Sequence, residues 1–379
     1  MNWSNEADPP QQGELAQSES RGPKTMGDLQ KTITMAQIAK AAGVSQGAIS
    51  SLLNDRDYGI RVSERTRERV FKVCREMGYI PNDLRAVVRM YPELGEYCLM
   101  LSSSVAAGVG DPFVARLVRS AMDAIGDPAH PLTLAVYDPE KEYSGAPDEL
   151  PVPIRSGIVS KFLFFGLPNQ SLIQQVLRRG LAVISLGTEV PLAGVANLVP
   201  DYASAAKGAI KNLGGLGHRH VGIVSGPFGA NDPQIIELHH GVRMACEELG
   251  LQIEAQNIVY GDLTYRAGAA AAEELLSHPV KPTAVFCLTD AAAAGVLAHA
   301  ASRGLRIPGD LSVIGCGDDP FSEVVQPQLT TVHIPAEEMA RRAIAAIDRI
   351  IQSPLASEPT KELIPVRLIE RGSSGPAMS

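Results

Sequence analysis

The stretch TITMAQIAKAAGVSQGAISSLLN, residues 32–54, decides how the N-terminal part of the chain folds. Thr34 and Gln37 stand three residues apart at the start of a helical pattern, a spacing that lets both side chains bond the free N–H groups of a first turn. Gly43 predicts a tight turn, and Ser45 predicts the cap of a second helix. The stretch therefore predicts two short helices joined at a glycine.

A third helix follows and completes a small helical domain over residues 31–80. Ser63 is its expected cap, Val70 and Met77 lie at helical spacing, and Gly78 is expected to end it. The second helix of the three presents a polar face. Such a helix fits the major groove of double-stranded DNA, where each base pair displays its own donors and acceptors.

The charge of the chain is distributed unevenly. The 379 residues carry a net charge of −8, yet residues 31–92 hold eleven basic and six acidic side chains. A basic module on an acidic body is the footprint expected of a protein that binds phosphate locally. Residues 1–30 are polar and acidic with few apolar side chains, and we expect them to form a disordered leader.

After Pro92 short apolar strands alternate with helical stretches over nearly 280 residues. This alternation predicts parallel, doubly wound sheets, and the length indicates two of them with a cleft between. The expected strands are YCLMLSSS (97–104), LTLAVYD (132–138), KFLFFGL (161–167), LAVISLG (181–187), HVGIVSG (220–226), AVFCLTD (284–290) and LSVIGCG (311–317). The expected helices are 113–125, 171–179, 203–213, 235–249, 265–276 and 291–302.

Three linked motifs resemble the headpiece of the LacI/GalR repressor family. AGVS at 42–45 and LLN at 52–54 fall within its helix-turn-helix, and VSERTRERV at 62–70 and GYIPN at 78–82 follow in order. The resemblance implies that base-reading positions lie just after the turn and one helical turn further on, at Gln46, Gly47 and Ser51. A glutamine suits adenine, whereas Ser51 replaces the usual arginine. A solvated Gln46 without a DNA contact remains the alternative.

Other headpiece residues are expected at the DNA backbone. Thr34, Ser45 and Asn54 are candidates for phosphate contacts through side chains or helix N-termini. Arg56 and Arg61 lie in a loop about three residues longer than the family norm, and solvated loop charges are their alternative interpretation.

PNDLRAVVRM at 81–90 falls in the family's hinge-helix slot, within a linker expected over 81–92. The resemblance implies that an apolar side chain of this helix wedges into the minor groove. Val88 stands where leucine is usual, and Arg85 stands where alanine is usual. A plain linker is the alternative.

The resemblance continues through residue 374 and implies a periplasmic-binding-protein-like core of two lobes, with a small molecule bound between them. It rests on NLGGLGHRHVGIVSGP (212–227), PTAVFCLTDAAAAGVL (282–297), the block at 304–335 and LIPVRLIERGSS (363–374). The expected domains are an effector-binding and dimerisation core over 93–374, with lobe one at 95–200 and 331–354, lobe two at 201–330 and 355–372, and a tail at 375–379.

The pocket departs from the family more than the scaffold does. Leu238 occupies the slot of a sugar-binding arginine, Thr289 that of an asparagine, and Gly317 that of an aspartate. An apolar side chain cannot give the bidentate recognition of an arginine. The residues expected near the effector are Asp111, Phe113, Asp290 and Asp318; for Asp290, a helix N-cap is the alternative.

Other classes of protein fit the sequence poorly. No phosphate loop, nucleophile elbow or dinucleotide motif is present, so we expect neither an enzyme nor a cofactor. The HxH at His218 and His220 lacks a matching set of metal ligands. A transport solute-binding protein would need a signal peptide, whereas no signal or membrane-spanning run is found and the cytoplasm is expected. We expect a homodimer on a pseudo-palindromic operator, with a regulator that works through protein partners as a second possibility.

Overall fold

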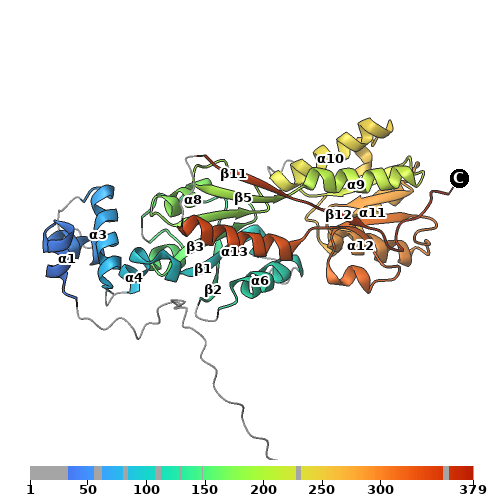
Figure 1. Cartoon of the computed structure of the whole chain (residues 1–379). Helices are drawn as coiled ribbons and strands as arrows, with labels where there is room; N and C mark the ends of the chain where they lie inside the picture. Colours follow the sequence, from blue (N-terminus) through green and yellow to red (C-terminus); the bar gives the residue numbers. More distant parts are fainter. Residues whose placement is uncertain are drawn as a thin grey trace, which may run out of the picture. The chain divides into compact units, whose positions relative to one another are not determined.

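The computed structural model describes residues 33–54, 62–79, 84–106, 112–127, 130–146, 148–227, 232–352 and 358–378. The expected leader at 1–30 lies outside these ranges. The chain divides into two compact units, with the division between Met90 and Tyr91. The first unit is helical and the second is α/β with two six-stranded sheets (Figure 1).

The helical unit contains α1 (Met35–Ala42), α2 (Gln46–Asn54), α3 (Glu64–Met77) and α4 (Leu84–Met90). Its predicted caps are confirmed. Thr34 and Gln37 form the reciprocal capping box, and the Ser63 hydroxyl accepts from the backbone N–H of Thr66 at 3.3 Å. Gly43 and Gly78 take the left-handed conformation that ends α1 and α3, which glycine adopts without steric cost.

The buried side chains of this unit are apolar and come from all three helices of the helix-turn-helix region. Ile38 of α1, Ile49 and Leu53 of α2, and Val70 of α3 are each no more than 2% exposed. They lie at the three- and four-residue spacings that place side chains on one face of a helix. The core of a helix-turn-helix domain thus forms around the turn at Gly43.

The first lobe of the second unit is a fully parallel sheet, consistent with the expected doubly wound fold. Its strand order is β11-β5-β4-β3-β1-β2. The strands are β1 (Glu96–Ser102), β2 (Leu132–Tyr137), β3 (Val159–Phe165), β4 (Ala182–Leu186), β5 (Val195–Pro200) and β11 (Thr360–Ile364).

Alternate residues of β1 face opposite sides of this sheet, and both sides are covered. Leu99 and Leu101 pack in the cluster shared with α6 (Pro112–Ile125) and α13 (Ala336–Gln352). Cys98 and Met100 pack in the cluster shared with α8 (Gln170–Leu177). Burial on both faces explains why the strand reads as a continuous apolar run.

The second lobe has the strand order β12-β10-β9-β8-β6-β7, in which only β12 runs antiparallel to its neighbour. One face is covered by α9 and α10, which lie side by side in Figure 1, and the other by α11 and α12. The strands are β6 (Val221–Ser225), β7 (Ile258–Tyr260), β8 (Ala284–Cys287), β9 (Ser312–Gly317), β10 (Thr330–His333) and β12 (Arg367–Ile369). The helices are α9 (Tyr202–Gly215), α10 (Pro233–Leu249), α11 (Tyr265–Ser277) and α12 (Asp290–Ser302).

The C-terminal crossings between the lobes differ from the expected boundaries. Residues 331–354 were expected in the first lobe, but β10 pairs with β9 of the second, and only α13 belongs to the first. Residues 355–372 were expected in the second lobe, but β11 pairs with β5 of the first. Without β11, the backbone N–H and C=O groups on the outer side of β5 would have no strand partner in this sheet. β11 supplies partners for these groups.

Shorter elements connect these layers: η2 (Pro92–Leu94), α5 (Ser103–Ala106), α7 (Val152–Ser156), η3 (Ala255–Asn257) and η4 (Pro320–Glu323). None of the helices in the described ranges is long and apolar enough to span a bilayer.

Candidate nucleic-acid interface and effector site

The N-terminal turn of α2 is capped and exposed. The Ser45 hydroxyl accepts from the backbone N–H of Ala48 at 3.1 Å, so the predicted cap of α2 is confirmed. Gln46 and Gly47 are exposed, and Ser51, one turn further on, is half-buried. The capped helix therefore presents Gln46 in its first turn, while Ala48 and Ile49 point into the core.

The other predicted DNA contacts are only partly described by the structure. Thr34 is exposed, and its hydroxyl takes part in the capping of α1. Asn54 ends α2 and Arg85 lies in α4, but the positions of their side chains are not described. Arg56 and Arg61 lie outside the described residues.

Val88, the predicted minor-groove wedge, is only 4% exposed. It lies in α4, so the predicted hinge segment is helical. The backbone carbonyl of Met90, the last residue of α4, accepts from the Arg75 guanidinium of α3 at 3.0 Å. Val88 is thus not presented to solvent in this conformation.

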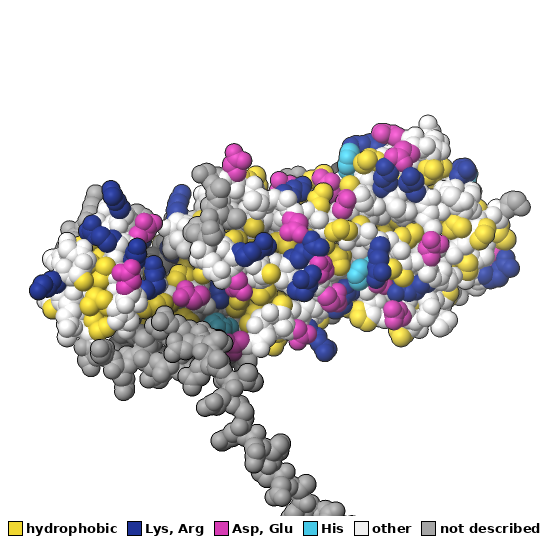
Figure 2. All heavy atoms as spheres, viewed as in Figure 1, with side chains coloured by type: hydrophobic (Ala, Val, Ile, Leu, Met, Phe, Trp, Pro, Cys, Tyr) yellow, Lys and Arg dark blue, Asp and Glu magenta, His cyan; other side chains and the backbone are white. Residues whose placement is uncertain are grey.

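Basic side chains cover the described surface of the helical unit. Figure 2 shows Lys and Arg side chains spread over its visible face, with fewer Asp and Glu among them. Lys72 pairs with Glu76 at 3.9 Å, but both side chains are more than half exposed, so the pair leaves the surface open to phosphate. The described basic residues of the three helices are Lys40, Arg65, Arg67, Arg69, Lys72 and Arg75.

Phe113 is the predicted effector residue that best fits a binding role. It is half-buried near the start of α6, and its ring stacks on that of Phe165 with a centroid distance of 5.7 Å. The guanidinium carbon of Arg116 lies 5.8 Å from the centroid of the Phe113 ring. Asp111, its predicted neighbour, lies outside the described residues.

Asp290 is completely buried, and its carboxylate is occupied by the protein. One oxygen accepts from the hydroxyl of Thr331; the other accepts from Asp319 N–H at 2.8 Å and from the Ser322 hydroxyl at 2.9 Å. Burial raises the pKa of Asp290, and these three donors oppose that effect. The geometry places this side chain in the scaffold, so it does not support the predicted effector contact. Nor is Asp290 the N-cap of α12, because Thr289 is.

Asp318 is also held by protein groups. Its carboxylate lies 2.7 Å from the Arg371 guanidinium and 2.8 Å from Nδ1 of His333. Burial acts to raise the pKa of Asp318, but the hydrogen bonds from Arg371 and His333 outweigh it and hold the pKa below its usual value. The structure therefore places the carboxylate of this predicted effector residue in an ionic cluster with Arg371 and His333.

The three substituted pocket positions have structural roles of their own. Leu238 is 5% exposed in the apolar core. The Thr289 hydroxyl donates to the carbonyl of Leu263 at 2.8 Å. Gly317 has φ 139°, a conformation that side chains disfavour. None of the three supplies a polar group in the way its family counterpart is expected to do.

Arg116 is the residue that the sequence interpretation missed. It lies one turn after Phe113, is 15% exposed, and forms an ion pair with Glu337 at 3.0 Å. No local pattern distinguishes it, because α6 carries a second arginine, Arg119, whose side chain is 85% exposed. Only contacts made across about two hundred residues reveal its role.

The histidines act as structural polar groups. His218 is 1% exposed, with its ring nitrogens at 2.9 Å from the Thr283 hydroxyl and 3.0 Å from the carbonyl of Gly375. His239 Nε2 lies 2.7 Å from the hydroxyl of Ser225. Within the described ranges, no group of His, Cys, Asp and Glu is arranged to hold a metal ion.

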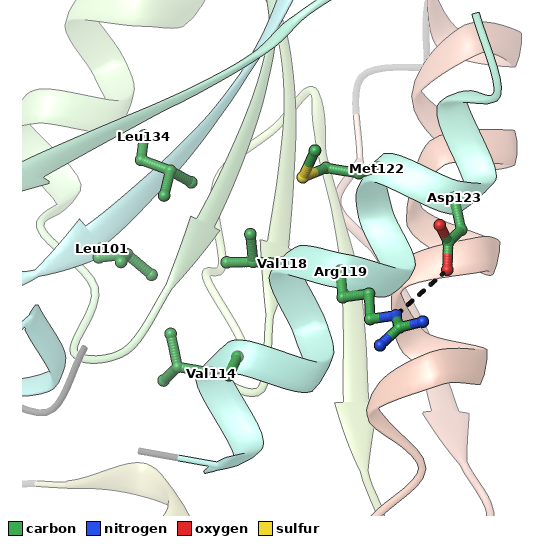
Figure 3. A pocket seen from close by; sticks show the side chains of 8 residues that line it. Leu101, Val114, Val118, Arg119, Met122, Asp123 and Leu134 are labelled. Atoms are coloured by element: carbon green, nitrogen blue, oxygen red, sulfur yellow. Dashed lines mark ion pairs between the residues drawn. The ribbon is translucent and has the colours of Figure 1, made fainter. Parts of the chain in front are cut away.

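A shallow apolar groove of about 320 Å³ lies on the first lobe, between α6 and the adjoining strands β1 and β2. In Figure 3, the side chains of Leu101, Val118 and Leu134 point toward one another across it, and Met122 closes one end. Met122 and Leu134 are 59% and 48% exposed. β2 is also the edge strand of its sheet, so one of its sides has no strand partner within the described chain.

Comparison with known proteins agrees with this architecture. The family of bacterial regulatory proteins named lacI matches residues 34–82, and the periplasmic binding protein-like domain matches residues 210–374. The HTH-type transcriptional repressor CytR of Escherichia coli (strain K12) is 30% identical over 353 residues, which cover 90% of this chain and 96% of CytR. The chain belongs to the LacI family.

Other LacI-family proteins align over the same length. The HTH-type transcriptional regulator DegA of Bacillus subtilis (strain 168) is 27% identical, over 90% of this chain and 98% of DegA. The solved complex of the transcriptional regulator CelR with cellobiose has a TM-score of 0.64 and 26% identity, over 90% of this chain and 99% of CelR. As a LacI-family member the chain is a DNA-binding transcriptional regulator modulated by a small molecule, and not an enzyme.

Proposed function

We propose that this LacI-family regulator binds a pseudo-palindromic operator as a homodimer and represses transcription, as the name of CytR indicates for that relative. The observation that carries the proposal is the capped N-terminus of α2, with Gln46 and Gly47 exposed on a basic helical unit. Gln46, Gly47 and Ser51 read bases. Thr34, Ser45, Asn54, Arg56 and Arg61 contact phosphates, while Arg85 and Val88 act in the minor groove.

Selection from random-sequence DNA tests the proposal. The full chain is expected to enrich a two-fold symmetric sequence, because two copies present two α2 helices. Gln46→Ala removes a bidentate side chain and is expected to weaken the selected site by about tenfold and relax one base position. Lys40→Ala, which removes a positive charge elsewhere on the same domain, is the comparison: it is expected to weaken binding to all sequences alike and to leave the base preferences unchanged.

Two outcomes separate the possibilities. If Gln46→Ala enriches the same sequence with the same affinity, Gln46 does not read a base. If the wild-type chain binds only in a salt-sensitive manner with no enriched sequence, the proposed specific recognition is wrong.

We propose that the homodimer forms through the α6–β2 face. Its support is the apolar groove with Met122 and Leu134 exposed, together with Val136, 52% exposed, on the edge strand β2. Apolar side chains gathered at an unpaired edge are usually covered by a partner. Met122→Glu is expected to give a monomer by sedimentation, because a charge would be buried in each copy. Val280→Glu, at a 55% exposed valine of the second lobe, is the control. A dimer that persists in Met122→Glu would rule out this face.

We propose that the effector, a sugar or a related metabolite, binds between the lobes near Asp111, Phe113 and Asp318. The supports are the half-buried Phe113 ring and the cellobiose complex of the relative CelR. Thermal shift with a sugar and nucleoside panel tests this, because a ligand of the folded state raises its stability. Phe113→Ala should abolish the shift. We also propose that the protein acts in the cytoplasm, where the DNA that it binds lies.

A regulator that works through protein partners without a free effector is the second candidate. It is favoured by the structural roles of Leu238, Thr289 and Gly317, which leave the family's polar clamps missing. No thermal shift with any small molecule, combined with operator binding, would support this candidate over an effector sensor.

A further inference from the structure

Arg116 connects three parts of the core that belong to different lobes. Its guanidinium donates to the backbone carbonyl of Asp318 at 2.8 Å and to that of Ile334 at 3.0 Å. Its Nε donates to the Glu337 carboxylate at 3.0 Å. Arg116 lies in α6 of the first lobe. Asp318 follows β9 of the second lobe, and Ile334 lies where the chain crosses from one lobe to the other.

The backbone after β9 has the conformation that these bonds need. Gly317 has φ 139° and Asp318 has φ 56°, so two successive residues adopt conformations that most side chains avoid. The carbonyl of Gly317 also lies near the guanidinium, at 3.4 Å from Arg116. The turn therefore directs two successive carbonyls of the second lobe toward one side chain of the first.

The Asp318 side chain fixes this turn. Aspartate is one of the few residue types that tolerate a left-handed conformation. The carboxylate of Asp318 is held by Arg371 and His333. The side chain of Asp318 is thus anchored within the second lobe, while its backbone carbonyl accepts from Arg116 of the first. Gly317 stands where the family has an aspartate that is expected to bind the ligand. Here its backbone carbonyl instead faces the Arg116 guanidinium of the first lobe.

We infer that Arg116 is a latch that holds the two lobes at a fixed angle without a bound molecule. The five donors of the planar guanidinium reach three carbonyls and a carboxylate at once, whereas a lysine has only three donors, all on one nitrogen. The side chain is 15% exposed, so these bonds are partly protected from water. Any molecule that changes the lobe angle must act against them. This inference does not depend on which DNA or effector the protein binds.

Pulsed electron spin resonance on the full chain tests the latch. Spin labels are placed at Gln170→Cys on the first lobe and Glu237→Cys on the second, both exposed positions, in a background in which the half-buried Cys246 is changed to serine. Labelled chains are mixed with an excess of unlabelled chains, so that distances within one copy dominate, and wild-type Arg116 is then expected to give one narrow interlobe distance. Arg116→Gln is expected to raise the population of other distances roughly tenfold, because several charge-assisted bonds are lost.

The matched control is Arg303→Gln on the second lobe, which removes the same charge at an exposed side chain that pairs with the exposed Glu273. It should keep the narrow distance. Equal distributions in Arg116→Gln, Arg303→Gln and wild type would overturn the latch. If Arg116→Gln does not fold by circular dichroism, Arg116→Lys decides. Lysine retains the charge, so a broadened distribution in a folded Arg116→Lys supports the fork of bonds, and an unchanged one rejects it.

Discussion

Replacing Asp290 tests whether a buried carboxylate supports the core of the second unit. Asp290→Ala leaves three donors without their acceptor: the hydroxyls of Thr331 and Ser322 and the N–H of Asp319. The site is 0% exposed, so water does not readily replace the carboxylate. Removing one partner from a buried polar network costs about 3–5 kcal/mol.

Asp290→Asn is the matched variant because it keeps the shape of the side chain. Its amide oxygen can accept from Asp319 and Ser322, and its NH₂ can donate to the Thr331 hydroxyl, which is able to reverse its role. Only the charge on the acceptor is lost, so a destabilisation of about 1 kcal/mol is expected. The two variants should therefore differ by several kcal/mol in the free energy of unfolding.

Calorimetry combined with far-UV circular dichroism is the appropriate assay, since the only tryptophan, Trp3, is far from the core in sequence. For a unit of this size 1 kcal/mol lowers Tm by roughly 2–3 °C. Asp290→Ala should thus melt roughly 6–15 °C below wild type, and Asp290→Asn only a few degrees below. A wild-type Tm for Asp290→Ala would refute the scaffold role. A wild-type Tm with a lost effector response would return Asp290 to the effector site.

Three further predictions follow from the described contacts. A Cβ at Gly241 of α10 would overlap the carbonyl oxygen of Ala203, whereas one at Gly208 of α9 meets no atom within 4 Å. In urea unfolding, Gly241→Ala should therefore destabilise the protein by about 3 kcal/mol, and Gly208→Ala should stabilise it by about 0.5–1 kcal/mol. Equal effects of the two substitutions would contradict the close packing of α9 and α10. Burial lowers the pKa of His218, although the hydrogen bond that its ring can donate to the Gly375 carbonyl opposes this effect, so the unfolded chain binds the proton more tightly. Stability is then full above the ordinary pKa of about 6.5 and falls as the pH drops below it, by at most about 1.4 kcal/mol per pH unit. His218→Gln should reduce this dependence, which calorimetry at two pH values measures. The pKa of Asp318 is lowered because the bonds from Arg371 and His333 outweigh the effect of burial. The contribution of Asp318 to the free energy of unfolding is therefore present above its ordinary pKa of about 4 and is lost as the pH falls through the lower pKa of the folded state. In acid unfolding, wild type should lose more stability than Asp318→Asn, and parallel curves would show that the cluster contributes no net stability.

The strands that the sequence predicts are those that read as apolar runs, whether they are buried on both faces, as β1 is, or partly exposed, as β2 is. The apolar runs of β1 and β3 are confirmed, because each buries alternate side chains on both sides of the first sheet. β5 and β11 were not expected as strands. β5 includes the polar Asn197 and ends at Pro200, and four of the five residues of β11 are exposed. Their pairing is decided by partners more than 150 residues away, which no local pattern encodes.

The candidate sites divide in the same way. Local rules gave the caps at Thr34, Ser45 and Ser63, and with them the exposed first turn of α2. The role of Arg116 depends on the backbone conformation at Gly317 and on contacts with a segment about two hundred residues later. The burial of Asp290 likewise depends on three donors from other elements. Chemistry that relies on long-range contacts was therefore beyond the reach of residue type and spacing.

The pairing of β11 with β5 has a consequence for the order in which the lobes are completed during synthesis. A ribosome makes the chain from its N-terminus, and domains generally fold as units once their residues have emerged. The first lobe begins at β1 but lacks α13 and its edge strand until Ile364 has been made. The second lobe, whose strands β6 to β10 are nearly continuous in sequence, lacks only β12 by that time. The first lobe, although its synthesis begins first, is therefore completed only a few residues before the second. A chain that is cut short before Thr360 leaves the outer side of β5 open to other molecules.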